Sequence, residues 1–144
     1  MRITEAIILA GGMGTRLREA VADVPKPMAP IGNRPFLAYL LDDLKIQKIK
    51  KVVLSVGYQY EVIQNYFGNH YKGIQISYSI ENQPLGTGGG IRLALNECRQ
   101  ENIFILNGDT FFKVNLSKLA TFHHRTQADL SIALKKMSHF DRYG

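Results

Sequence analysis

Short apolar runs alternate along this chain with segments whose apolar residues have helical spacing, and this alternation restricts the fold more than any other feature. Most of the runs are continuous, as in parallel strands covered on both faces. Strand, helix, strand order predicts right-handed βαβ units, and therefore an open, mostly parallel α/β sheet with helices on both faces. The predicted strands are Glu5–Ala10, Lys51–Gly57, Ile74–Glu81, Ile103–Asn107 and Asp129–Lys135, and the predicted helices are Pro35–Ile46, Tyr60–Phe67, Gly88–Arg99 and Leu116–Thr126.

Length and composition fit a single domain. The chain has 144 residues, 45% of them hydrophobic, which is enough for one core. No internal repeat, low-complexity segment or linker divides it, so no domain boundary is expected within residues 1–144. The last predicted strand is followed by Ser138–Gly144 without a closing helix. We therefore expect a sheet that lacks its C-terminal part.

Neither export nor membrane insertion is expected. The first apolar run is too short for a membrane span and leads directly into Gly11 and Gly12 rather than into a cleavage pattern. Cys98 is the single cysteine, so no internal disulfide can form. These features predict a cytoplasmic protein without a membrane partner.

The net charge of +6 favours an anionic partner without identifying it. The longest basic cluster, Lys45 to Lys51, is interrupted by apolar residues and fits a solvated helix end better than a nucleic-acid surface. No nucleic-acid partner is expected. A basic nucleic-acid binder would instead show steeply salt-dependent binding to DNA or RNA.

A glycine-rich turn directly follows the first predicted strand. The three glycines within Gly11–Gly14 permit backbone N–H groups to approach a phosphate, and Arg16 follows closely enough to grip the same anion. A P-loop would require Lys before Ser or Thr after the last glycine, and a dinucleotide fingerprint would require a small residue in place of Leu17. A tight strand-to-helix turn with a surface arginine remains the alternative.

A second cationic group follows in a proline-rich segment. Pro25 and Pro27 flank Lys26 and limit its backbone freedom, which favours a lysine placed for binding, although ordinary loops also contain this pattern. Together with the glycine turn, the segment provides N–H donors, an arginine and a lysine. This set suffices for a triphosphate.

Gly11–Leu17 and Pro25–Met28 together resemble the G-G-x-G-T-R-L and P-K-P signature of the sugar-phosphate nucleotidyltransferases. Four further segments match that family in the same order, namely Val56–Tyr58, Pro84–Gly89, Asn107–Asp109 and Arg142–Gly144. The resemblance implies a Rossmann-like sheet and an enzyme that joins a nucleoside monophosphate to a sugar 1-phosphate and releases pyrophosphate. The residues of these motifs are similar to those of guanylyltransferases that act on a heptose 1-phosphate in the synthesis of bacterial surface polysaccharides.

The resemblance also implies roles for individual residues. Arg16 is expected to stabilise the leaving pyrophosphate, and Lys26 to bind triphosphate oxygens. Asp109 ends an apolar strand, where a carboxylate can hold Mg²⁺ that bridges nucleotide and sugar phosphate, although Asn-Gly-Asp is also a good turn sequence. The predicted nucleotide-binding residues are Leu9, Gly11, Gly12, Gly14 and Thr15 in the first loop and Glu81, Gly86 and Thr87 in the second.

Glu81 favours guanine as the base. An ionised carboxylate only accepts hydrogen bonds, and guanine presents two adjacent donors that match its two oxygens, whereas the other bases place an acceptor beside a donor. Alternatively, Glu81 points to solvent and backbone groups read the base, which would also suit uracil.

Several functions therefore remain open. The leading one is a GTP-dependent guanylyltransferase acting on a heptose or hexose 1-phosphate, and the alternatives are a uridylyl or other sugar nucleotidyltransferase and a nucleotide-binding module without turnover. The resemblance implies a chain longer than 144 residues, whose remainder carries sugar-binding groups and a second acidic metal ligand. We therefore expect the 144-residue chain to bind nucleotide with little or no transfer. The sequence leaves a homo-oligomer open.

Overall fold

The computed structural model describes residues 2–12 and 24–136. The chain forms two compact units, Met1–Phe112 and Lys113–Gly144, and the prediction of a single domain stays a prediction. The elements of the first unit are β1 (Glu5–Leu9), η1 (Lys26–Met28), β2 (Pro30–Ile31), β3 (Arg34–Pro35), α1 (Phe36–Ile46), β4 (Lys51–Val56), α2 (Tyr60–Phe67), β5 (His70–Tyr71), β6 (Ile74–Ile80), α3 (Gly86–Leu95) and β7 (Phe104–Asn107). The second unit contains α4 (Leu116–Thr126).

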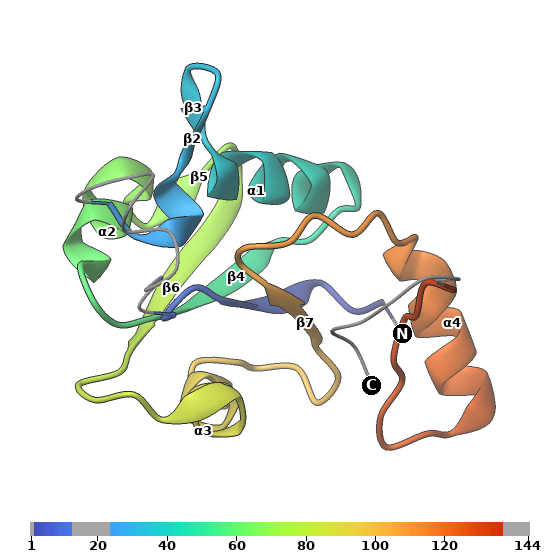
Figure 1. The fold of residues 1–144 in the computed structure, drawn as a ribbon. Helices are drawn as coiled ribbons and strands as arrows, with labels where there is room; N and C mark the ends of the chain where they lie inside the picture. The colour runs from blue at the N-terminus through green and yellow to red at the C-terminus, as the bar shows by residue number, and fades with distance from the viewer. Residues whose placement is uncertain (1, 13–23, 137–144) are drawn as a thin grey trace. The chain divides into compact units, whose positions relative to one another are not determined.

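The first unit is built on a five-stranded sheet in the order β5-β6-β4-β1-β7 (Figure 1). Strand β1 pairs in parallel with β4 and β7, so that Ala6 lies between Val52 and Phe104, and β4 pairs in parallel with β6. The short β5 is antiparallel to β6. The chain runs outward from β1 to β4 and β6, and it then returns to β7 on the other side of β1. The strand order therefore reverses at β1, which makes this point the topological switch of the sheet.

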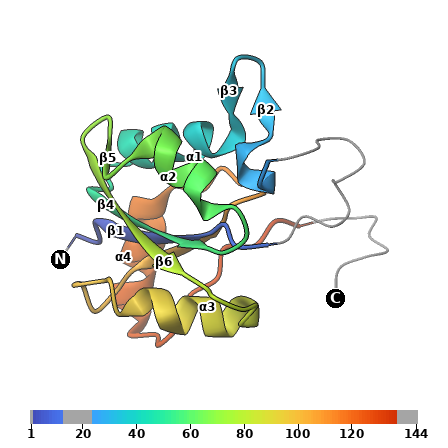
Figure 2. The ribbon, with the colours of Figure 1, turned by 90° about the vertical axis from the view of Figure 1, so that its left-hand side faces the viewer.

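Helices cover both faces of this sheet, as the sequence predicts. Figure 2 shows α1 and α2 on one face and α3 on the opposite face. Helix α1 buries Leu37, Leu41 and Leu44, which recur at helical spacing along one side. On the other face, Ala94 of α3 packs with Ile7 and Val53 in a buried cluster.

The predicted bounds of the helices are accurate except for α3. Helices α2 and α4 match the prediction, and α1 begins one residue later than predicted because Pro35 is its N-cap. Helix α3 begins two residues earlier than predicted and ends at Leu95. Local backbone hydrogen bonds, such as that from the N–H of Cys98 to the carbonyl oxygen of Leu95, turn the chain after the helix, and the carboxylate of Glu5 then accepts hydrogen bonds from the N–H groups of Arg99 and Gln100. A long-range contact therefore holds the segment that follows the helix.

The predicted strand Asp129–Lys135 is wrong. Within the described part of the second unit, residues 128–136 form no strand, and the side chains of Leu130, Ile132 and Leu134 are 72%, 68% and 85% exposed. The apolar pattern is present in the sequence, but a strand also requires hydrogen bonds to a neighbouring strand. The described residues provide no such partner for this segment.

A polar network ties the β2–β3 hairpin of the first unit to α1 and β5. The guanidinium of Arg34 donates to Asp42 at 2.6 Å and to the Tyr71 hydroxyl at 2.8 Å, and Lys72 donates to the same carboxylate at 2.8 Å. Burial by itself would raise the pKa of Asp42, but the hydrogen bonds from Lys72 and Arg34 outweigh it and leave that pKa below its usual value. The network lies away from the pocket described next.

Candidate functional site

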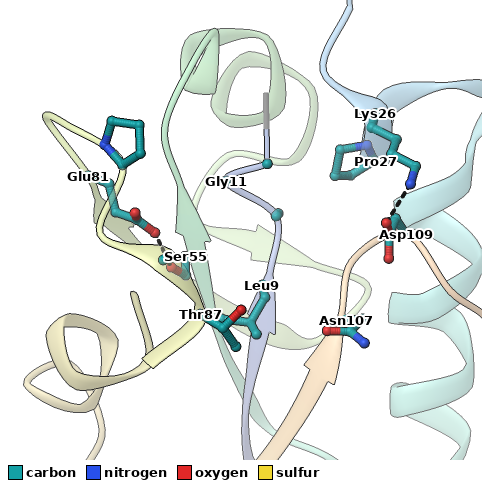
Figure 3. Close-up of a pocket in the computed structure, with 13 residues that line it drawn as sticks. Leu9, Gly11, Lys26, Pro27, Ser55, Glu81, Thr87, Asn107 and Asp109 are labelled. Carbon is teal, nitrogen blue, oxygen red and sulfur yellow. Dashed lines mark hydrogen bonds and ion pairs between the residues drawn. The ribbon is translucent and has the colours of Figure 1, made fainter. Parts of the chain in front are cut away.

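A pocket of about 350 Å³ opens at the carboxyl ends of the parallel strands, at the switch point beside β1 (Figure 3). This is where open α/β sheets bind their ligands. The pocket extends from the end of β6, across the ends of β4 and β1, to the end of β7. Its lining residues are Leu9, Ala10, Gly11, Gly12, Lys26, Pro27, Ser55, Glu81, Pro84, Gly86, Thr87, Asn107 and Asp109.

Gly108 brings the end of β7 close to the end of β1. Its N–H donates to the carbonyl oxygen of Leu9 at 2.8 Å, and a Cβ at this position would lie only 2.6 Å from that oxygen. A side chain would therefore force the two strand ends apart. The close approach carries the next residue, Asp109, into the pocket.

Lys26 and Asp109 meet at the β7 end of the pocket. The Lys26 Nζ lies 2.5 Å from Asp109 Oδ2, and the two side chains are 37% and 40% exposed. Asp109 Oδ1 accepts a second hydrogen bond from the Thr110 hydroxyl at 3.1 Å. The hydrogen bond from Lys26 is the main cause that holds the pKa of Asp109 below its usual value, and Thr110 acts in the same direction. This end of the pocket therefore combines a cation with an ionised carboxylate.

Glu81 lies at the opposite end of the pocket, just beyond β6, and both of its carboxylate oxygens accept hydrogen bonds from the protein. Its Oε1 accepts a hydrogen bond from the Ser55 hydroxyl at 3.1 Å, drawn as a dashed line in Figure 3. Its Oε2 accepts from the N–H of Leu85 at 3.0 Å. A Cβ at Gly11 would come within 3.3 Å of Oε1, so the backbone at Gly11 passes close to this carboxylate.

The N-terminus of α3 forms part of the same wall. Gly86 adopts a φ of +70°, which glycine tolerates without strain, and it lines the pocket together with Thr87. The first N–H groups of a helix have no partners within the helix, and they carry a partial positive charge. Anionic or carbonyl groups of a ligand are therefore favoured here.

A second hollow of about 350 Å³ adjoins the Glu81 end of the first pocket. The two hollows share Gly11, Glu81 and Pro84. The second hollow is lined by Gly11, Gly57, Tyr58, Gln59, Tyr60, Glu61, Ile80, Glu81, Asn82, Gln83 and Pro84. Glu81 therefore stands between two spaces, and the loop after β6 forms a wall of both.

The structure brings most of the predicted site residues together. Leu9, Gly11, Gly12, Lys26, Glu81, Gly86, Thr87 and Asp109 all line the one pocket. Gly14, Thr15 and Arg16 lie outside the described residues, so the predicted convergence of Arg16 with Lys26 stays a prediction. The individual roles given to all these residues are likewise predictions.

Sequence reasoning missed two polar residues of the pocket, Ser55 and Asn107. Ser55 interrupts the apolar run of β4, and Asn107 ends β7, so each is a polar residue near the carboxyl end of a buried strand. A polar residue at the carboxyl end of a buried strand was therefore the sequence signal that could have identified each of them. The partner of Ser55 could not be read from it, because Glu81 is 26 residues away in the sequence.

Comparison with known proteins shows to which family the chain belongs. The family model described as nucleotidyl transferase matches residues 5–144. The chain belongs to this nucleotidyl transferase family. The family predicted from the glycine turn and the P-K-P segment is thereby confirmed.

Three relatives in this family illustrate the likeness. The chain is 55% identical to a D-glycero-alpha-D-manno-heptose 1-phosphate guanylyltransferase of Aneurinibacillus thermoaerophilus, over 97% of this chain and 61% of that protein. It is 51% identical to the protein of the same name from Campylobacter jejuni, with the same coverage. It is 37% identical to a mannose-1-phosphate guanylyltransferase of Mycobacterium tuberculosis, over 92% of this chain and 37% of that protein. The chain spans about three fifths of the length of the first two.

Two solved structures share the fold of this chain. HddC from Yersinia pseudotuberculosis complexed with GMP-PN superposes with a TM-score of 0.75 at 34% identity, over 84% of this chain and 54% of that one. A UTP-bound UGPase from Acinetobacter baumannii superposes with a TM-score of 0.77 at 21% identity, over 88% of this chain and 54% of that one. These matches confirm the predicted Rossmann-like fold.

Proposed function

We propose that this protein transfers GMP from GTP to a heptose or hexose 1-phosphate, forming a GDP-sugar and pyrophosphate for bacterial surface polysaccharides. The observation that carries the proposal is one pocket with Lys26 and Asp109 at one end and Glu81 at the other. The names of the similar guanylyltransferases support it. Among the described helices, none is long and apolar enough to cross a membrane. We assign the reaction to the cytoplasm, where GTP is available.

The two ends of the pocket suit the two ends of a nucleotide. The triphosphate is the anionic end, so it belongs beside Lys26 and the glycine turn that begins at Gly11. The base then lies at the Glu81 end. Each oxygen of an ionised carboxylate can accept two hydrogen bonds, and each oxygen of Glu81 accepts one from the protein. One acceptor position on each oxygen is left for the adjacent N1–H and N2 amino donors of guanine.

The chemistry requires positioning and charge neutralisation. An oxygen of the sugar phosphate attacks the α-phosphorus of GTP, a new P–O bond forms, and the bond to pyrophosphate breaks in line with it. Lys26 binds triphosphate oxygens and neutralises their charge. Arg16 has the predicted task of stabilising the departing pyrophosphate. No nucleophilic side chain takes part in the proposed reaction.

Asp109 fits a magnesium ion. Its carboxylate is partly exposed in the pocket, and its pKa is lowered by Lys26, so it is ionised at neutral pH. Mg²⁺ is often held by one or two carboxylates together with substrate phosphates and water. The described residues contain no group of three or more His, Cys, Asp or Glu placed for a metal. When bound, Mg²⁺ would neutralise phosphate charge, while Lys26 would exchange Asp109 for a phosphate oxygen.

Two measurements test the proposal. The first compares the thermal shifts that GTP, UTP, CTP, dTTP and ATP produce with Mg²⁺, because a ligand that binds only the folded state raises its Tm. We expect the largest shift from GTP, and equal shifts from all five would overturn the assignment of the base. The second measures pyrophosphate release from GTP with a panel of sugar 1-phosphates. Because the chain spans about three fifths of the similar guanylyltransferases, we expect it by itself to bind nucleotide with little or no release, and vigorous release would overturn that expectation.

A further inference from the structure

Ser55 lines the pocket and contacts Glu81. Its side chain is 1% exposed, and its hydroxyl donates to Glu81 Oε1 at 3.1 Å. The space around this bond is made by Gly90 of α3, where a Cβ would lie 2.7 Å from Oε1 and 3.1 Å from the Ser55 Oγ. The helix thus approaches the pair so closely that only a glycine fits without displacing it.

A second donor holds the other oxygen of the same carboxylate. The N–H of Leu85, the N-cap residue of α3, donates to Glu81 Oε2 at 3.0 Å. Donors from two elements, β4 and the start of α3, therefore fix both oxygens. A carboxylate held at both oxygens has a defined plane, whereas one held at a single oxygen can rotate about that bond.

We propose that Ser55 is a positioning residue for base specificity: by holding Glu81 Oε1 it sets the carboxylate plane that meets the two adjacent donors of guanine. The inference rests on the proposed function. A fixed carboxylate favours guanine and also rejects the other bases, because their acceptor atom would face a carboxylate oxygen. A carboxylate freed from Ser55 can turn away from that repulsion. The loss of Ser55 therefore weakens GTP binding and relaxes the rejection of other nucleotides.

The neighbouring strand offers a matched control. Ser79 of β6 pairs with Ser55 in the register of the sheet, so the two side chains share one face. Ser79 is 5% exposed, and its hydroxyl has no hydrogen-bond partner within the described part of the chain. Ser79→Ala therefore removes a buried hydroxyl from the same face without removing a bond to Glu81.

The experiment measures the affinities for GTP, UTP and ATP, each with Mg²⁺, by titration calorimetry of the wild-type chain, Ser55→Ala, Ser55→Cys and Ser79→Ala. We expect Ser55→Ala to lower the ratio of GTP to UTP affinity by about tenfold, as the loss of a hydrogen bond to a charged group predicts. Cysteine is only slightly larger than serine and donates weakly, so Ser55→Cys should also lower the ratio of GTP to UTP affinity. Ser79→Ala should keep the wild-type ratio. The Tm of each variant without nucleotide reports its stability.

The outcomes separate this inference from the function on which it rests. A wild-type chain that binds nucleotides without preferring GTP overturns the guanine assignment and, with it, the role of Ser55. A wild-type preference for GTP that survives unchanged in Ser55→Ala overturns the inference alone, and so does an equal weakening of all three nucleotides. If Ser55→Ala fails to fold, the affinity ratio of Ser55→Cys decides in the same way.

Discussion

The two ends of the pocket hold their charged side chains differently. At the β6 end, Glu81 accepts hydrogen bonds from a buried hydroxyl and a backbone N–H. At the β7 end, Lys26 and Asp109 are about two-fifths exposed and pair with each other. The first arrangement is rigid, because moving the carboxylate breaks bonds to two elements of the fold. The second is exchangeable, because water or a ligand can replace either partner at little cost. A base needs a fixed acceptor geometry, while phosphates and a metal must enter and leave. The contrast thus matches the two ends of a nucleotide.

The largest expected effect tests the exchangeable end. Lys26→Met should weaken the binding of GTP with Mg²⁺ by about 10- to 100-fold, because a charge-assisted contact to phosphate is lost. The free energy of unfolding should change by less than about 1 kcal/mol, since the ion pair is exposed. Calorimetric titration and urea unfolding measure the two quantities. Lys72→Met is the control, because it removes an exposed, ion-paired lysine outside the pocket. Equal loss of affinity in both variants would contradict a local role for Lys26.

The next effect tests the rigid end. Glu81→Gln should reduce the preference for GTP over UTP by about tenfold, because an amide offers one acceptor and one donor group where guanine presents two donors. It should also lower stability by about 1 kcal/mol, since the amide nitrogen cannot accept from Ser55 or Leu85. Competition binding with both nucleotides measures the preference. An unchanged preference would assign base reading to backbone groups such as those of Gly86.

A third change sharpens the comparison without replacing a polar residue. Gly90→Ala places a Cβ 2.7 Å from Glu81 Oε1, and overpacking of this kind outweighs the better helix propensity of alanine. We expect a net loss of about 1–2 kcal/mol in the free energy of unfolding, together with a weaker preference for GTP. Gly88→Ala, in the same helix, meets no atom within 4 Å. It should instead stabilise the chain by up to about 1 kcal/mol, and a loss in both variants would show that helix geometry, not Glu81, is responsible.

The smallest effect is a pH dependence at the exchangeable end. The pKa of Asp109 is lowered by Lys26, so the pair stabilises the fold above the unfolded pKa of about 4, and this contribution is lost as the pH falls through the lower, folded value. Asp109→Asn should therefore cost less than about 1 kcal/mol at pH 7, and the difference from wild type should shrink below about pH 4. Thermal unfolding between pH 3 and pH 7 at low salt measures it. A difference that grows towards low pH would contradict the sign.

Local sequence patterns were sufficient for the central elements. Three segments show the element they form in the spacing of their own apolar residues, and each forms the predicted element. They are the apolar run before the glycine turn, the stripe of leucines in Phe36–Ile46 and the segment Tyr60–Phe67. The family was predicted from the residues of two motifs, Gly11–Leu17 and Pro25–Met28, because glycine, proline and charged residues at fixed spacing are local signals. The site at the carboxyl ends of the strands followed from the α/β order.

Contacts between distant residues were decided by the tertiary structure. The strand predicted at Asp129–Lys135 has the right pattern but no neighbour in the described residues. The predicted helix Gly88–Arg99 includes Arg99, whose N–H instead donates to the distant Glu5. Lys26 and Asp109 are 83 residues apart, and no local pattern pairs them. Periodicity and motifs determine what one segment can form. Only the packing of strands side by side determines which residues meet at their ends.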